Sequence, residues 1–412
     1  MLNRGSTVII VNDFAYISGG ASSVALSSAR ELARRGVATI LFSAIAPIDP
    51  SLQESGVRVV CLDQSTVEES TNKLGTAAQA VWNRRAAETL EKVLAPLDPS
   101  KTIVHLHAWT IGVSSSIVPV VLKHGARLVI TIHDYFLACP NGGFYNYSTE
   151  TICHLKPLST GCVMTNCGPG SYPKKLWRVF RETIQNTAGR LPGSIRNFIC
   201  VSPLSKEVMQ PFLPPESKIY DISNPIDVIQ APPVDVARND YFVMVGRLSA
   251  SKGPILLADA ARVSQTRIRF IGDGELRQQL ESEYPEAEVT GWLSQTEVQK
   301  YLSQARALVF ASRWYEAQGL VILEAAGRGI PTVVADVCAG RDSISNGVTG
   351  LLFRGGDMSD LANKISSLKD DTKVSQLGRA AYDRYWKNPT TLEKHVDQLE
   401  ACYVNMMETV AR

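Results

Sequence analysis

The chain has 412 residues, of which 45% are hydrophobic and 20% charged, and its formal net charge is +2. This length fits two to three domains of about 150 residues each, and the composition is typical of a globular protein rather than a disordered one. The mildly basic balance gives no reason to expect nucleic acid as a partner, and no apolar stretch approaches the ~18 residues of a membrane-spanning helix.

The first half of the chain alternates short apolar runs with longer segments of helical period. Most of the runs are continuously apolar, as expected for strands that are buried on both faces of a sheet. The predicted strands are Thr7–Val11, Ala38–Phe42, Val57–Cys61, Ile103–Leu106, Leu128–Ile132 and Asn197–Val201, with helices at Gly20–Arg35 and Thr76–Ala95 among the segments between them. This alternation predicts a mostly parallel sheet with helices on both faces.

The same pattern restarts after a proline-containing linker at residues 228–239. The strands predicted there are Tyr241–Val245, Ile268–Ile271, Ala287–Thr290, Ala307–Phe310 and Thr332–Ala335. We therefore expect an α/β protein with two Rossmann-like, doubly wound domains facing across a cleft, with ligands at the carboxyl ends of the strands. The predicted limits are 1–227 with an insertion at 139–170, 240–385, and 386–412. The last segment carries a helix from Thr390 to Met407 that crosses back to the first domain.

Two cations follow the first strand of the second half. Arg247 can grip two phosphate oxygens at once, and Lys252 supplies a compact charge, so the pair suits a diphosphate. The alternative is a solvated loop with two surface cations. Glycines at 272, 274 and 291 end the next strands and would let a ligand approach the backbone closely. Trp292 could stack on a nucleotide base or could equally lie in the core or in a turn.

Two carboxylates lie eight residues apart, Glu316 in a loop and Glu324 on the helix that follows. Residues Gly319, Leu320 and Val321 should form the start of that helix, where free N–H groups and the helix dipole favour phosphate. A ligand with hydroxyls at both ends and a diphosphate in the middle is a nucleotide sugar. The alternative is an ordinary helix with one acid in its first turn and another at its surface.

These motifs, in this order, resemble the retaining glycosyltransferases of family 4, which have the GT-B fold. The resemblance rests on Gly246-Arg247, Lys252-Gly253, Gly272-Asp273-Gly274, Gly291, Glu316-x7-Glu324, residues 347–352 and residues 224–227, and it covers nearly the whole chain. It implies that Arg247 and Lys252 bind the donor diphosphate, that Glu316 contacts the sugar and that Glu324 contacts the ribose. Gln318 departs from the family, which usually has a large residue there, and this affects the expected shape of the sugar pocket.

The first half should complete the site. The loop at Gly19 and Gly20 resembles the family's glycine loop near the diphosphate and acceptor, and it lacks the G-x-G-x-x-G pattern of dinucleotide-binding dehydrogenases. His133 matches the family's histidine that faces the donor sugar, whereas His105 and His107, at the neighbouring strand end, are expected to be structural more often than functional. His133 and Glu316 are thus the candidate catalytic residues.

The sequence has no Asp-x-Asp pair to hold a divalent metal against a diphosphate, so we expect no catalytic metal. Cations and helix N-termini would then stabilise the leaving group. No residue is an obvious nucleophile, and the expected reaction retains the anomeric configuration without a covalent intermediate.

Four cysteines, Cys139, Cys153, Cys162 and Cys167, fall within 29 residues directly after His133-Asp134. The chain resembles a subgroup of the family with cysteines in this insertion. The first interpretation is a structural zinc site that staples a long loop beside the acceptor site, although a close C-x2-C pair is missing. Disulfides, free thiols and an iron–sulfur site are the alternatives. Cys61, Cys200, Cys338 and Cys402 are expected to be scattered core residues.

Residues 172–196 carry six Lys or Arg side chains and one acid, with Trp177, Phe180 and Ile184 at helical spacing. This segment could contact an anionic membrane or the phosphate of a lipid acceptor. The alternative is an amphipathic helix packed on the first domain with its cations in solvent. The first apolar run is too short for a signal peptide, so we expect a cytoplasmic protein, in peripheral contact with the inner face of the membrane if the first interpretation holds.

The sequence therefore predicts a hexosyltransferase-type enzyme of polysaccharide biosynthesis. It would move a sugar from a nucleotide diphosphate sugar to a saccharide or a lipid-linked glycan, with no nucleic acid partner. Two other classes stay open, an epimerase-type enzyme that modifies the nucleotide sugar, and a non-catalytic, metal-stapled binding subunit.

Overall fold

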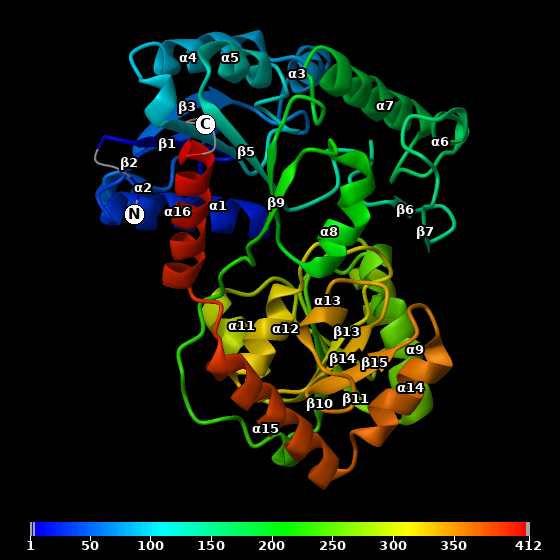
Figure 1. The fold of residues 1–412 in the computed structure, drawn as a ribbon. Coiled ribbons are helices and arrows are strands. Elements are labelled where there is room, and N and C mark those ends of the chain that lie inside the picture. The colour runs from blue at the N-terminus through cyan, green and yellow to red at the C-terminus, as the bar shows by residue number, and fades with distance from the viewer. Residues whose placement is uncertain (1, 3–4, 409–412) are drawn as a thin grey trace.

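The computed structural model describes residue 2 and residues 5–408 of the chain. Figure 1 shows two α/β halves, each built on its own sheet. The first sheet is parallel throughout, in the order β3-β2-β1-β4-β5-β8-β9. Its strands are β1 (Thr7–Val11), β2 (Ala38–Ile45), β3 (Arg58–Gln64), β4 (Thr102–Leu106), β5 (Arg127–Ile132), β8 (Asn197–Cys200) and β9 (Lys218–Asp221).

The second sheet is also parallel, in the order β12-β11-β10-β13-β14-β15. Its strands are β10 (Tyr241–Val245), β11 (Arg267–Ile271), β12 (Glu288–Val289), β13 (Ala305–Phe310), β14 (Thr332–Ala335) and β15 (Gly350–Phe353). The prediction of two Rossmann-like α/β halves is thus confirmed. The strand prediction missed β9 and β15, because KIYD begins and ends with a charged residue and GLLF begins with a glycine.

Helices cover both faces of the two sheets. Those of the first half are α1 (Gly20–Arg34), α2 (Pro50–Glu54), α3 (Lys73–Val81), α4 (Arg84–Leu94), α5 (Ile117–His124), α6 (Thr160–Met164), α7 (Tyr172–Thr187) and α8 (Pro203–Met209). Those that follow are α9 (Pro254–Ser264), α10 (Arg277–Glu283), α11 (Gln295–Leu302), α12 (Leu320–Gly327), α13 (Gly340–Ser343), α14 (Met358–Ser367), α15 (Asp371–Lys387) and α16 (Leu392–Glu408).

The single helix predicted at Thr76–Ala95 is wrong, because the chain breaks between α3 and α4. Trp82 is extended, and the Asn83 side chain caps the new helix by accepting from the Ala86 N–H at 3.0 Å. The Asn83 N–H in turn donates to Ser114 Oγ at 2.9 Å. An asparagine stabilises a helix more at the N-cap than in the helix interior, so a new helix starts at this residue.

The last helix, α16, leaves the second half and packs on the first (Figure 1). It lies against α1, and its buried side chains join the cluster that covers one face of the first sheet. These side chains are Val396, Leu399, Cys402, Tyr403 and Met406. Each is shielded almost completely from solvent, and such burial stabilises the folded state by roughly 1.5–3 kcal/mol for a large apolar side chain. The domain limits at 227, 240 and 385 stay predictions.

The cysteine-containing insertion lies between β5 and α7. It has little regular structure, namely α6 and the two-residue strands β6 (Tyr145–Asn146) and β7 (Thr151–Ile152), which pair antiparallel. The Glu150 carboxylate pairs with the Arg313 guanidinium of the second half, and Gly143 packs against the Trp314 ring. The insertion therefore contacts the loop that carries Glu316.

Candidate active site

A cavity of about 140 Å³ lies between the two halves. Its walls include the glycine loop at Gly20, the end of β5 at His133, the loop at Glu316 and the first residue of α12, Leu320. A Cβ atom on Gly20 would lie 3.9 Å from the Leu320 side chain, so the two loops face each other directly. The structure thus brings together four predicted site residues from distant parts of the sequence.

Glu316 is the most tightly held carboxylate of this cavity. It is 7% exposed, accepts a hydrogen bond from Ser312 Oγ at 2.8 Å and pairs with the Lys252 ammonium. That ammonium also lies 5.7 Å from the centre of the Trp314 ring, in cation–π geometry. Lys252 and Glu316 were predicted to act on different parts of one ligand, and here each neutralises the other.

The glycines after β10 and β11 have a packing role that sequence reasoning did not identify. A Cβ atom on Gly272, at φ +148°, would lie 2.0 Å from the Gly246 carbonyl oxygen, and one on Gly274 would lie 2.5 Å from that of Leu248. Two backbone hydrogen bonds, Gly246 N–H to Ile271 and Leu248 N–H to Asp273, join the same loops. Only glycine permits this contact, which fixes the loop between β10 and Lys252.

Gly291 has a positive φ of +74° and lies under the Arg277 guanidinium. Arg277 pairs with Asp273 at 2.8 Å and with Glu281 at 2.8 Å, and sequence reasoning did not select it. Arg247 is exposed at the end of β10. Trp292 is 82% exposed, so its placement in the core is excluded.

The helix α12 begins at Leu320, as predicted, with Gly319 as its N-cap and no side chain capping its N–H groups. Gly319, Leu320 and Val321 thus open the helix, with backbone donors free for an anion. Glu324, one turn further on, accepts from Gln299 Nε2 at 3.1 Å, and burial raises the pKa of its carboxyl. Arg247, Lys252, Glu324 and the glycines at 19, 272, 274, 291 and 319 are not among the residues that line the 140 Å³ cavity.

Three histidines form a chain that begins in the wall of this cavity, at His133. His133 Nε2 lies 2.9 Å from His107 Nδ1, and their rings are stacked at 5.1 Å. The ring of His107 also lies 4.1 Å from that of His105, whose two nitrogens contact Tyr403 and Thr131 at 2.6 and 2.7 Å. Burial lowers the pKa of all three, that of His133 to about 3, so the chain is uncharged at neutral pH.

Two further carboxylates were missed by sequence reasoning. Asp13 is fully buried at the end of β1 and accepts from three backbone N–H groups, those of residues 111, 112 and 113, at 2.8–2.9 Å. It thereby fixes the loop after β4. Asp134, next to His133, accepts from the Phe136 N–H, and burial raises its pKa to about 6. Two polar residues, Asn12 and Asp13, follow a buried strand, and this was the available signal for Asp13.

The helix α7 packs with its polar face inward. Gln185 links Trp109 to the Phe136 carbonyl oxygen, and Arg181 lies over the Phe136 ring at 4.8 Å. The interpretation that its cations lie in solvent is therefore wrong for Lys175 and Arg181, because they meet buried acceptors and rings in the first half. The buried residues of α7 are Lys175, Arg181, Glu182 and Gln185, and its exposed large side chains are Tyr172, Leu176 and Phe180.

The four clustered cysteines have free thiols, three of them buried and Cys153 half-buried. The Lys175 ammonium donates to Cys167 Sγ at 3.2 Å and to Cys162 Sγ at 3.7 Å. Across residues 2 and 5–408, no three Cys, His, Asp or Glu side chains are arranged to hold a metal ion. The zinc site and the absence of a catalytic metal stay predictions.

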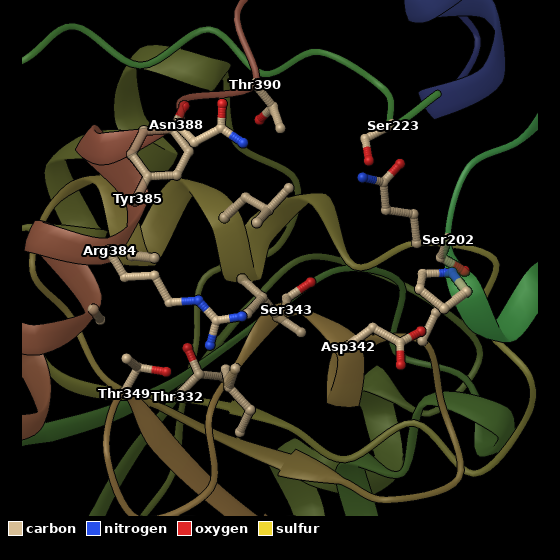
Figure 2. Close-up of a pocket in the computed structure, with 18 of the residues that line it drawn as sticks. Ser202, Ser223, Thr332, Asp342, Ser343, Thr349, Arg384, Tyr385, Asn388 and Thr390 are labelled. Carbon is tan, nitrogen blue, oxygen red and sulfur yellow. The ribbon is translucent and has the colours of Figure 1, made fainter. Parts of the chain in front are cut away.

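A second cavity, of about 350 Å³, lies on the other side of the segment at Gln318, which lines both cavities. Figure 2 shows the Arg384 side chain extending into it from α15, with Ser202 and Ser223 of the first half on its far wall. The Gln318 side chain accepts from the Asn224 N–H at 3.0 Å and so connects the halves. This cavity contains none of the predicted site residues.

Comparison with solved structures defines the fold. UDP-bound Alr3699/HepE of Anabaena superposes with a TM-score of 0.67 over 97% of this chain and all of that one, at 17% identity. Sucrose-phosphate synthase of Thermosynechococcus elongatus gives a TM-score of 0.68 over 98% and 100%, at 16% identity. The two-sheet architecture is thus the GT-B fold of glycosyltransferases, as predicted.

The sequence identifies the family within this class. Residues 18–230 match Glycosyltransferase Family 4, and residues 229–384 match Glycosyl transferases group 1, so the chain belongs to the family 4 glycosyltransferases.

Curated relatives match only in part. The UDP-Gal:alpha-D-GlcNAc-diphosphoundecaprenol alpha-1,3-galactosyltransferase of Escherichia coli is 26% identical over 41% of this chain and 47% of its own length. Sulfoquinovosyl transferase SQD2 of Arabidopsis thaliana is 33% identical over 36% and 31%. The chain therefore spans less than half the length of either relative. None of the helices within the described residues has the length and hydropathy that a membrane crossing needs.

Proposed function

We propose that the protein is a retaining glycosyltransferase that moves a sugar from a nucleotide diphosphate sugar to a saccharide or lipid-linked acceptor. The observation that carries the proposal is the 140 Å³ cavity, where the glycine loop, His133, Glu316 and the uncapped start of α12 converge. Each supplies what such a donor needs, namely close backbone approach, a polar contact to the sugar, and N–H donors for phosphate.

The proposed roles follow from the resemblance to the family. Lys252 and Arg247 hold the diphosphate together with the N–H groups of Gly319, Leu320 and Val321, while Glu316 accepts from hydroxyls of the sugar and Glu324 from those of the ribose. Because Lys252 pairs with Glu316, a donor that contacts both side chains must separate the two. The ammonium then turns to the diphosphate, and the carboxylate becomes free for the sugar.

The direct test incubates the protein with UDP-, GDP- and ADP-sugars and separates products by mass and by anomeric configuration. Transfer or slow hydrolysis with retained configuration supports the proposal. A changed sugar from donor alone would instead identify an epimerase, and an inverted product would contradict retention. No reaction with any of the three donors would favour a non-catalytic binding subunit.

We also propose that the exposed side of α7 contacts a membrane and so brings the enzyme to a lipid-linked acceptor. Tyr172, Leu176 and Phe180 lie one turn apart on this helix and are 36–56% exposed, with exposed Lys174 beside them. Apolar side chains flanked by cations suit an anionic interface. The Escherichia coli relative is named for a diphosphoundecaprenol-linked substrate, which agrees with such an acceptor.

Vesicle flotation tests this contact with phosphatidylglycerol and with phosphatidylcholine vesicles. We expect binding to the anionic vesicles only, and loss of binding in Phe180→Glu. Val263→Glu, which places the same charge on an exposed apolar position of α9 in the second half, is the matched control. Equal binding of wild type and Phe180→Glu would exclude α7 as the membrane contact.

A further inference from the structure

His107 contacts His133 and is not among the residues that line the 140 Å³ cavity. It is 3% exposed, and its Nδ1 lies 2.9 Å from His133 Nε2. Both rings are uncharged at neutral pH because they are buried. A single proton therefore occupies the contact between the two nitrogens, and its position fixes the tautomer of both rings.

The shared proton can belong to His133 Nε2 or to His107 Nδ1. The surroundings of His107 decide between these two arrangements. Its other nitrogen, Nε2, is buried and has no hydrogen-bond partner among the described residues. The cavity beside it is about 10 Å³, which is at the lower limit for one water molecule. If His133 donated to His107, then His107 Nε2 would carry a buried proton without an acceptor, which is costly because the N–H loses its hydrogen bond to water.

The opposite arrangement avoids this cost, because His107 Nε2 is then a bare acceptor, which proteins tolerate better than an orphaned N–H donor. In this arrangement His107 Nδ1–H donates to His133 Nε2, and His133 must carry its own proton on Nδ1. No hydrogen bond of that Nδ1 is found in the described part of the chain, so it is the nitrogen left for a ligand in the cavity.

We propose that His107 is a positioning residue that locks His133 in the Nδ1–H tautomer, so that His133 presents a hydrogen-bond donor to an oxygen atom of the donor sugar. His133 then cannot act as a general base, because one nitrogen is protonated and the other accepts from His107. This inference rests on the proposed function for the identity of the sugar, but the tautomer itself does not depend on it.

Nitrogen-15 spectra of the imidazole rings test the tautomer without any turnover. The chain has six histidines, and His133→Gln assigns the signal of His133. At pH 7 we expect a protonated Nδ1 and a bare Nε2 on both His133 and His107. A proton on His133 Nε2, or a doubly protonated ring, would overturn the proposal. A protein with this tautomer but no transfer to any acceptor would instead count against the proposed function.

Two variants of nearly equal shape test the direction of the hydrogen bond. His107→Asn keeps an N–H donor near the position of Nδ1, whereas His107→Asp offers only acceptors. We expect His107→Asn to keep the His133 tautomer and kcat/KM within about threefold. His107→Asp should move the His133 proton to Nε2 and lower kcat/KM by about tenfold, the effect of one hydrogen bond of typical net strength.

The matched control is Tyr403→Phe, which removes the hydroxyl that contacts His105 in the same buried chain. We expect it to lower the melting temperature but to leave the His133 tautomer and the donor KM unchanged. If Tyr403→Phe changed the tautomer as His107→Asp does, the effect would be general loosening of the chain. If His107→Asp does not fold, the wild-type spectrum still decides the proposal.

Discussion

The pair of Lys252 and Glu316 allows a quantitative prediction for Glu316→Gln. The amide keeps the shape of the side chain and can still accept from Ser312, but it removes the negative charge beside the ammonium. Breaking a fully buried ion pair costs 3–5 kcal/mol. Since the Lys252 side chain is 26% exposed, water stabilises part of its charge, and we expect a loss of about 2 kcal/mol.

This loss should lower the melting temperature by about 4–8 °C if the second half unfolds as one unit of ordinary size. Differential scanning calorimetry without nucleotide measures it. Lys252→Met in the Glu316→Gln background removes the unpaired charge, so the double variant should be more stable than Glu316→Gln alone. If the losses in stability caused by Glu316→Gln and by Lys252→Met simply added up in the double variant, the view that each side chain neutralises the other would be refuted.

The same variant should lose transferase activity by about 100-fold or more, the size seen when a preorganised polar contact to a reacting group is removed. Radiolabelled donor and product separation measure it at saturating donor. Unchanged turnover together with an unchanged melting temperature would refute both the pairing and the proposed role of Glu316.

Three further predictions concern other parts of the molecule. Glu324→Gln should weaken nucleotide binding, which a thermal-shift assay with UDP, GDP and ADP measures. A nucleotide at 100 times its Kd adds about 2.7 kcal/mol to the stability of the folded protein, so weaker binding gives a smaller rise in melting temperature. An equal rise in the variant and the wild type would exclude the ribose contact. Burial raises the pKa of Glu182 to about 8 from its ordinary 4.5, so the folded state loses stability as pH rises between these values. In urea unfolding, the free energy of unfolding of Glu182→Gln should rise relative to that of the wild type between pH 5.5 and pH 7.5. A difference between the two proteins that does not change with pH would contradict this. Metal analysis of protein purified without chelator should find about one zinc per chain if the cysteines bind it, and under about one per four chains would reject the zinc site.

The sequence was sufficient for the architecture because parallel strands buried on both faces are continuously apolar. Val8 to Val11 of β1 and all six residues of β13 are buried, and both strands were predicted. A strand that begins with glycine, such as β15, or one that has charged residues at both ends, such as β9, lacks this signal. Local patterns also gave the start of α12, because a glycine before an apolar helical run marks a helix boundary.

Contacts between distant residues could not be predicted in the same way. Lys252 and Glu316 were both selected, but nothing in their spacing indicates that they pair with each other. The polar face of α7 was expected in solvent because cations are usually exposed, yet Arg181 and Gln185 find buried partners more than 40 residues away in sequence. Likewise, the three acceptor contacts of Asp13 join β1 to a loop about 100 residues later.

The position of α16 has a consequence for synthesis on the ribosome. The first half supplies every strand of its own sheet within 221 residues, yet the cover of one face of that sheet is completed beside α1 by side chains from residues 396–406. On the ribosome, the first half therefore cannot complete its core before the second half has been translated, and until then Val8 and Ile10 are incompletely covered. A stop codon before Leu392 would remove no residue of the second sheet and would still leave the amino-terminal half exposed to chaperones and proteases.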